Sequence, residues 1–364
     1  MRQSMRKRME REPLNATEKY LFSISLSFGN TTNWIKKGNE INEVGRAASK
    51  VYGVYKKMLL KEKGIQVSLA VDAISTTIYG EADEKDFKEI LEIIKDDLFE
   101  NSLFEKAKLK AIKDLKQNYT DIEYRAIFKS YELIYFEQQF NFKDYIASHE
   151  KISIENIINI QENLVNKNNI YIFIYGDNSE KLLQEYMLSL KETKADIIFP
   201  KCLDMFPRDY KIKLIGEREN GMLTVKFNKK TDTQINSSKE YLCLMILGYF
   251  WFQKDYVVYT EFKNSSILAL NTKIAKVDLQ IKKLTKAMFF KIVESIKEVL
   301  NKRLSQKNKS FTLLMADLKA KGIDKEHLIK DIEQLNIEDV QVYIKEKTDS
   351  IQYGQVIFEG RKTK

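Results

Sequence analysis

The chain has 364 residues, of which 43% are hydrophobic and 31% charged, and this composition is typical of a folded protein with about two domains. Two cysteines, Cys202 and Cys243, exclude a disulfide scaffold and a zinc cluster of thiolates, and two histidines leave few ligands for the commoner zinc enzymes. The net charge of +9 could attract nucleic acid, but no nucleic-acid-binding motif accompanies it, so we do not expect nucleic acid as a partner.

The N-terminal segment MRQSMRKRMEREP is basic, and no apolar stretch follows it as it would in a secretory signal. The longest apolar run, Tyr241–Phe252, is shorter than the ~20 residues needed to cross a bilayer. It therefore predicts a buried core helix. We expect no membrane span and a cytoplasmic location, where reduced cysteines are normal.

The first half of the chain opens with a predicted strand over 21–28, LFSISLSF. The alternating, β-branched segment 67–81 predicts two strands of a hairpin. A helix follows it, with Asp83 as its N-cap. Its apolar residues recur at the spacing i, i+3, i+4, i+7, i+11, which places them on one helix face: Phe87, Ile90, Leu91, Ile94 and Leu98.

The second half repeats this order. A strand is predicted over 222–228, and alternating segments follow within 256–281. Thr285 then stands at the start of a helix, as Asp83 does in the first half. The apolar residues of this helix have the same spacing: Phe289, Ile292, Val293, Ile296 and Leu300. Both halves then close on a short helix and a strand, with Ser153 and Asn336 as the two helix caps.

The sequence therefore predicts an α+β protein with two homologous domains in tandem, each a mostly antiparallel sheet with helices packed on it. We place the domains at 16–190 and 212–360. The segment between them, 191–211, contains Pro200 and Pro207 and is the predicted linker.

Three segments carry a resemblance to a known family. Residues 21–58 resemble the first strand, turn and metal-binding helix of the insulinase (pitrilysin-type, inverted-zincin) metallopeptidases. Residues 99–117 resemble the later helix that supplies their distal acidic ligand, and 152–177 resemble the helix and strand that close each of their domains. The resemblance covers nearly the whole chain, from residue 16 to about 360.

The chemistry of that family depends on the zinc motif H-x-x-E-H, whose two His bind the metal and whose Glu activates water. The resemblance places Ala48 and Tyr52 at the two His positions and Val51 at the Glu position. Asp114 is the match to the distal acid. The motif is lost, so we expect neither catalytic residues nor a metal or other cofactor in this chain, and zinc only in a partner subunit.

The two histidines do not offer another zinc site in the sequence. His149 lies next to Glu150 in a predicted loop, and His327 lies next to Glu326 in a polar helical stretch where we expect an exposed side chain. Neighbouring residues on regular structure face apart.

Active relatives also hold substrate with an Arg and a Tyr of the second copy. Tyr259 matches the Tyr, but Phe252 or Gln253 stands where the Arg would be. The surrounding aromatic residues could form a peptide-binding wall, although we expect them to fill the core of the second half: Tyr249, Phe250, Trp251, Phe252, Tyr256 and Tyr259.

The resemblance implies a non-catalytic subunit that pairs with a homologous, zinc-bearing insulinase-like subunit. The chain is similar to the paired insulinase-like proteins of bacteriocin biosynthesis clusters, so the implied substrate is a leader peptide or another short peptide. Three alternatives remain open: a structural core protein, a basic nucleic-acid-binding protein, and a peptidase with non-standard metal ligands.

Overall fold

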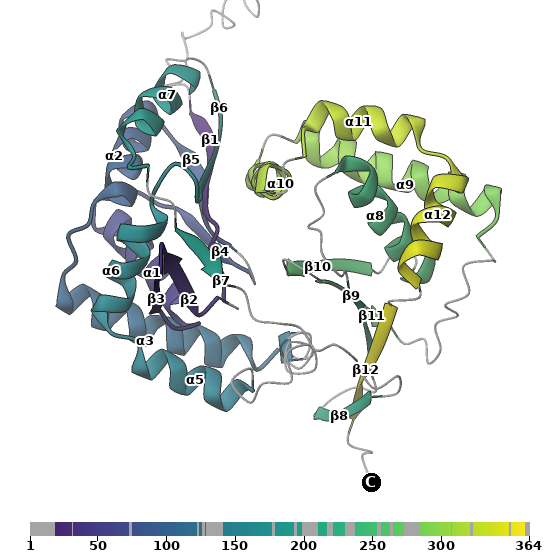
Figure 1. The fold of residues 1–364 in the computed structure, drawn as a ribbon, viewed down its shortest axis with the longest axis horizontal. Coiled ribbons are helices and arrows are strands. Elements are labelled where there is room, and N and C mark those ends of the chain that lie inside the picture. The colour runs from purple at the N-terminus through teal and green to yellow at the C-terminus, as the bar shows by residue number, and fades with distance from the viewer. Residues whose placement is uncertain are drawn as a thin grey trace, which may run out of the picture.

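The structure is a computed structural model of the chain, in which each half forms helices packed on a sheet (Figure 1). The description covers residues 19–30, 32–72, 75–121, 124–125, 128, 141–176, 179–192, 195–198, 210–216, 221–229, 237–252, 256–262, 265–272, 284–306, 308–320, 323–348 and 351–360. Within these ranges it covers only the backbone for 210–229, 247, 251–272, 309, 319–320, 344 and 346–360.

The first half folds into a four-stranded sheet in which all neighbouring strands are antiparallel, in the spatial order β4-β5-β1-β6. The strands are β1 (Tyr20–Leu26), β4 (Ser68–Val71), β5 (Thr76–Ala82) and β6 (Ile170–Tyr175). The helices are α1 (Ala48–Glu62), α2 (Glu84–Lys95), α3 (Asn101–Asn118), α5 (Phe142–Lys151), α6 (Ile154–Leu164) and α7 (Ser179–Ser189). Every second residue of β1, from Tyr20 to Leu26, enters the core beneath these helices.

A smaller sheet in the order β3-β2-β7 accompanies the first half. Its strands are β2 (Trp34–Lys37), β3 (Glu40–Glu43) and β7 (Asp196–Ile198). Strand β7 belongs to the segment predicted as a linker, and it pairs with β2 by placing Ile198 opposite Trp34. Part of that segment is therefore held against the first half.

The second half forms a five-stranded sheet in the order β10-β11-β9-β12-β8, in which only the β12–β8 pair is parallel. The strands are β8 (Tyr210–Gly216), β9 (Gly221–Lys229), β10 (Tyr256–Phe262), β11 (Ser265–Thr272) and β12 (Ile351–Gly360). The helices are α8 (Ser238–Phe252), α9 (Lys286–Ser305), α10 (Lys309–Ala320), α11 (Lys325–Gln334) and α12 (Ile337–Thr348).

The two sheets have the same topology. The order β4-β5-β1-β6 of the first half corresponds strand by strand to β10-β11-β9-β12 of the second. Along the chain, α1 lies between β1 and β4 in the first half, and α8 lies between β9 and β10 in the second. The predicted fold class, two α+β domains in tandem with mostly antiparallel sheets, is confirmed.

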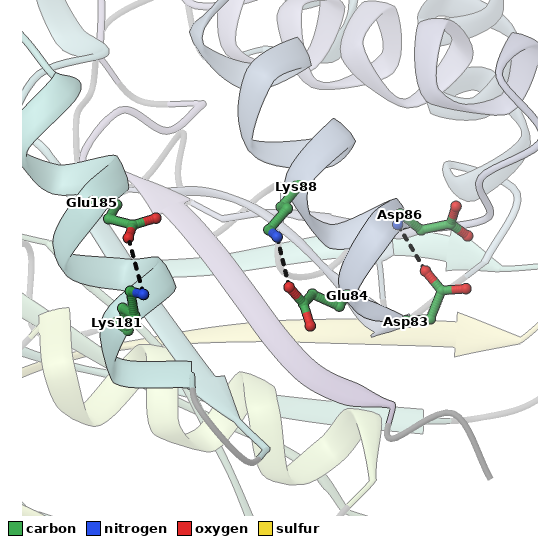
Figure 2. Close-up of polar contacts among 6 residues, drawn as sticks. All are labelled: Asp83, Glu84, Asp86, Lys88, Lys181 and Glu185. Carbon is green, nitrogen blue, oxygen red and sulfur yellow. Dashed lines mark hydrogen bonds and ion pairs between the residues drawn. The ribbon is translucent and has the colours of Figure 1, made fainter. Parts of the chain in front are cut away.

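Side-chain caps begin the helices where the sequence predicts them. Asp83 Oδ1 accepts a hydrogen bond of 2.8 Å from the backbone N–H of Asp86 (Figure 2). Such a bond satisfies one of the free N–H groups of a helix start. The other predicted caps also lie at helix starts: Thr285 before α9, Ser153 before α6 and Asn336 before α12.

The apolar faces lie against the cores as predicted, with Ile292 partly buried, except at the end of α2. Phe87, Ile90, Leu91 and Ile94 are buried, whereas Leu98 is 75% exposed. Helix α2 ends at Lys95, and the chain turns into an extended conformation at Asp96. The placement of Leu98 on the buried helix face was therefore wrong, because α2 ends before this residue.

The predicted buried helix over 241–252 is confirmed by α8, in which Tyr241 to Ile246 are all buried. Tyr249 and Phe250 pack partly buried against the core of the second half, which favours the core interpretation of these two aromatic residues. The side chains of Trp251, Phe252, Tyr256 and Tyr259 lie outside the description. In the described part of the chain, no helix is both long and apolar enough to span a bilayer.

Helix α10 joins the two halves. It packs across β1, β5 and β6 of the first sheet, on the face opposite the first half's own helices (Figure 1). The Ser23 hydroxyl of β1 donates a buried hydrogen bond of 3.1 Å to the carbonyl oxygen of Thr312. The ring of Phe311 lies 5.4 Å from that of Phe173, between centroids. Strand β1 is consequently buried on both faces.

The turn before α1 requires a glycine. Gly45 has φ of 76°, and a Cβ at this position would lie 2.7 Å from Cδ1 of the buried Ile152. Gly38 provides a matched control, because its φ is 60° but no atom lies within 4 Å of the added Cβ.

We expect Gly45→Ala to lower the free energy of unfolding more than Gly38→Ala does. Both substitutions carry a left-handed backbone cost of about 1 kcal/mol, and only the first also crowds the core, at about 1–3 kcal/mol more. Denaturant unfolding of the two variants measures this difference. Equal losses would contradict the close packing at Gly45.

Candidate functional site

The three residues that the sequence resemblance assigns to the zinc motif lie on one buried face of α1. Ala48 and Val51 are 0% exposed and Tyr52 is 1% exposed. The helix contacts α3, α6 and the strands β4 and β5, and its first turn carries no acidic residue and no side-chain cap. The face that would carry metal ligands in a zinc peptidase is thus packed as part of the core.

Tyr52 forms a hydrogen-bonded link from α1 to two other helices. Its hydroxyl donates to Oε1 of Gln161 over 2.8 Å, and Nε2 of Gln161 donates to the carbonyl oxygens of Ile94 and Lys95, over 3.0 and 2.9 Å. Burial, together with the nearby Tyr186, raises the pKa of Tyr52 well above its ordinary value. The phenol is therefore a neutral donor that ties α1 to α6 and to the end of α2.

Lys56, one turn after Tyr52, is also completely buried. Its Nζ donates to the carbonyl oxygens of Ile93 and Asp96 over 2.8 and 2.6 Å, and it lies 4.9 Å from the ring centroid of Phe99. Burial lowers the pKa of Lys56 to about 7, although the charges of Asp96 and Asp97 oppose this shift. The amine caps the C-terminal end of α2 from inside the protein.

Sequence reasoning did not identify Lys56 or Gln161 as part of this region. The one available signal was the phase of Lys56, which follows Ala48 and Tyr52 at i+8 and i+4 on the same helix face. A lysine in phase with buried apolar residues needs an internal partner. Its partners are main-chain carbonyl groups, which have no sequence signature.

Asp114, the match to the distal acid, lies on α3 in an ion pair of 2.6 Å with Lys110. Its side chain is 27% exposed, whereas the fully buried residues of this helix are Ala107 and Ala111. Asp114 does act electrostatically on Lys50 of α1. Burial lowers the pKa of Lys50, and the Asp114 carboxylate opposes this shift. It is not hydrogen-bonded to any of the three motif positions.

The predicted loop around His149 was wrong. Asn141 caps α5 by accepting a hydrogen bond from the N–H of Asp144, and the helix continues through His149 to Lys151. His149 is fully buried, and its Nδ1 lies 2.8 Å from the carbonyl oxygen of Tyr145. Burial lowers the pKa of His149 to about 4, so the ring is neutral.

The other predicted residues give no metal site. His327 lies on α11 and is exposed, as expected. Tyr259 lies on β10, the outermost described strand of the second sheet, at a register irregularity, but its side chain is outside the description. Among the residues that the structure describes, no three His, Cys, Asp or Glu side chains converge to hold a metal ion.

Solved structures with the same fold were found, although no protein-family model and no curated protein matches the sequence. The chain aligns with an M16-like peptidase from Alicyclobacillus acidocaldarius at a TM-score of 0.74 and 12% identity, covering 94% of this chain and 93% of the other. It also aligns with a Helicobacter pylori protease at a TM-score of 0.66 and 12% identity, covering 94% of each chain.

A third similar structure is described as an inactive M16 peptidase domain from Pseudomonas fluorescens, with a TM-score of 0.63, 10% identity and coverage of 94% of each chain. At such identities the similarity concerns architecture. Together with the matched topology of its two halves, it shows that the chain has the tandem α+β fold of M16-like peptidases.

We expect the free energy of unfolding of the protein, minus that of the Lys56→Met variant, to rise with pH between about 7 and 9. Lys56 has a folded pKa of about 7, whereas its unfolded value is near 10.5, so the unfolded chain binds more protons in this window. The slope from this residue approaches about 1.4 kcal/mol per pH unit. The neutral amine keeps two hydrogens for its two carbonyl partners.

Chemical unfolding at several pH values measures this difference. Lys57→Met is the matched control, because Lys57 is the exposed neighbour on the same helix. A pH dependence that is identical in the protein and in Lys56→Met would show that the buried amine does not titrate in this range.

Proposed function

We propose that the chain is a non-catalytic subunit that works with a homologous, zinc-bearing insulinase-like peptidase. One observation carries this proposal: the chain has an M16-like fold, and the three residues that the sequence resemblance assigns to the zinc motif, Ala48, Val51 and Tyr52, are all packed into the core. Alanine and valine have no donor atom for a metal and no group that could activate water, and the neutral Tyr52 hydroxyl is hydrogen-bonded to Gln161. The chain keeps the fold but lacks the residues of the zinc chemistry that this fold usually carries.

The proposed contribution of this chain is peptide binding. Strands β4 and β6 are the outermost described strands of the first sheet, and an exposed sheet edge can add an extended peptide through main-chain hydrogen bonds. Tyr175, at the end of β6, is 41% exposed, with its ring 6.1 Å from that of Phe311 of the second half. This strand thus lies where the two halves meet.

The substrate that we propose is a leader peptide or another short peptide, such as a bacteriocin precursor, processed in the cytoplasm. The basic net charge of +9 would speed the encounter with an acidic peptide or an acidic partner subunit. This choice of substrate, partner and compartment rests on the sequence resemblance.

The purified chain is expected to bind no stoichiometric zinc and to cleave no peptide alone. The triple variant Ala48→His, Val51→Glu, Tyr52→His should not gain zinc-dependent cleavage, because it places three polar groups in a filled core and costs several kcal/mol of stability. Tyr52→Phe, which removes only the hydroxyl, should cost about 1 kcal/mol.

Metal analysis after dialysis, peptide cleavage with and without chelator, and denaturant unfolding measure these outcomes. One zinc per wild-type chain together with chelator-sensitive cleavage would overturn the proposal and favour a peptidase with non-standard ligands.

Mixing the chain with a motif-bearing homologue from a neighbouring gene is expected to raise that homologue's peptidase rate. The pair should bury at least ~1,200 Å² of surface to be stable. Substitution of Tyr171 and Tyr175 by alanine should remove the gain. Lys181→Ala, on the exposed surface of α7, should leave it intact.

Peptidase rates, cleavage sites and complex formation by size-exclusion chromatography measure this prediction, with thermal unfolding to confirm that the variants fold. If the homologue is fully active alone and the chain changes neither rate nor cleavage site, the subunit role fails.

A further inference from the structure

Lysines form a continuous row along the exposed side of helix α3. Lys106, Lys110 and Lys113 follow one another at the spacing i, i+4 and i+7, which places them on one helix face, and all three are exposed. With a rise of about 1.5 Å per residue, the row spans about 10 Å along the helix axis. Lys116, also exposed, continues it by a further i+3 step. We call Lys106, Lys110 and Lys113 together the lysine face.

Little negative charge balances the lysine face within the chain. Lys110 pairs with Asp114 over 2.6 Å. Lys106 and Lys113 make no ion pair with any residue that the structure describes. On α2, by contrast, the exposed Lys88 has an acidic partner one turn away. Like charges one turn apart destabilise a helix, so an anion bound across the lysine face would relieve a repulsion that the fold itself leaves in place.

Helix α1 adds positive charge beside the lysine face. Burial lowers the pKa of Lys50 on α1, the Asp114 carboxylate opposes this shift, and the charges of Lys57 and Lys110 add to it. Lys57 is exposed on α1 and Lys110 is exposed on α3, and both lie close enough to Lys50 to act on it. The positive surface is therefore wider than one helix and can face more than a single counter-ion.

An exposed leucine lies next to the lysines. Leu109 of α3 is 66% exposed, and on the helix it neighbours Lys106 at i−3 and Lys113 at i+4. A single exposed leucine is ordinary on a protein surface. In this position, however, it offers an apolar contact between ammonium groups. Such a surface matches an acidic segment that also carries an apolar side chain.

The residue types of this surface favour a protein segment over other polyanions. Nucleic-acid sites commonly combine positive charge with arginine and with aromatic side chains on which bases stack, and the exposed residues of α1 and α3 include neither. A helix that lies on a membrane presents several large apolar side chains. On α3, which the structure describes in full, Leu109 is the one exposed side chain of that kind.

We propose that the lysine face binds an acidic helical segment of a protein, which carries carboxylates at the spacing i, i+4 and i+7 and an apolar side chain against Leu109. Carboxylates at that spacing lie on one face of the segment and match the lysines along the helix axis. The proposal deepens the subunit role and rests on it for the identity of the partner, because an acidic partner subunit would supply the segment.

The test uses the full chain and a fluorescent alanine-based peptide of about 15 residues, a length that allows a helix to form. The peptide carries glutamates at the spacing i, i+4 and i+7 and one leucine. A matched peptide has glutamine in place of each glutamate. Fluorescence anisotropy at low ionic strength is expected to show binding of the glutamate peptide that weakens with salt, and no binding of the glutamine peptide.

Charge-matched variants test the location. The combined substitution of the three residues of the lysine face by glutamine should weaken binding of the glutamate peptide by about tenfold. The control lowers the net charge equally on exposed positions of α9 and should leave the affinity nearly unchanged. It combines Lys286→Gln, Lys291→Gln and Lys302→Gln. Thermal unfolding confirms that both variants fold.

The exposed leucine has its own test. Leu109→Ala should weaken binding of the glutamate peptide by about threefold, because an apolar contact is lost. The same substitution should have no effect on a glutamate peptide in which alanine replaces the leucine. An equal effect on both peptides would contradict the apolar contact.

No binding of the glutamate peptide would overturn the proposal. Equal weakening by the two charge-matched variants would also overturn it, because net charge and not the lysine face would then be the cause. Single-stranded oligothymidylate and phosphatidylserine vesicles are expected to displace the peptide only at higher concentration than the unlabelled peptide does. Displacement by either at a lower concentration would assign the face to nucleic acid or to a membrane surface and overturn the proposal.

This experiment separates the lysine face from the subunit role. If a homologue's peptidase rate rises on mixing but the glutamate peptide does not bind, the lysine face fails and the subunit role stands. If the peptide binds but the chain changes neither the rate nor the cleavage site of the homologue, the subunit role fails and the partner is another acidic protein.

Discussion

The packing of α1 is the constraint on which the rest of the first half depends. This helix contacts the sheet and the helices α2, α3 and α6. Lys56 donates directly to carbonyl groups at the end of α2, and Tyr52 donates to Gln161, which donates to two more of them. Those carbonyl groups would otherwise remain unsatisfied inside the protein, at a cost of about 1–3 kcal/mol each.

This packing also shows that the buried face of α1 holds the fold together without the residues of an H-x-x-E-H motif. A zinc site needs an open cavity and several polar ligands that other groups orient. At the corresponding positions the chain has Ala48, Val51 and Tyr52, which fill the space and leave one hydroxyl paired with Gln161. The polar interactions there now hold helices together, and the stability of the domain depends on them.

The first sheet separates two surfaces with different character. On one face, α10 of the second half covers β1 and β6, and this contact unites the tandem domains. On the other face lie the helices whose ends converge on an acidic hollow.

The sequence by itself determined the architecture and the absence of an H-x-x-E-H motif. Periodicity and caps are local properties, which is why the faces of α2 and α9, the caps at Asp83 and Thr285 and the tandem α+β fold could be predicted. The absence of histidine before His149 needs no structure to be recognised.

Only the tertiary structure decided what packs around α1. Lys56 and Gln161 bind main-chain carbonyl groups of a helix far away in the sequence, and His149 is buried on α5, which begins at the cap Asn141. A hollow lies among α1, α2, α6 and α7 because these four helices end at one place. Contacts between distant segments leave no periodic signal, since they depend on how the elements pack in space.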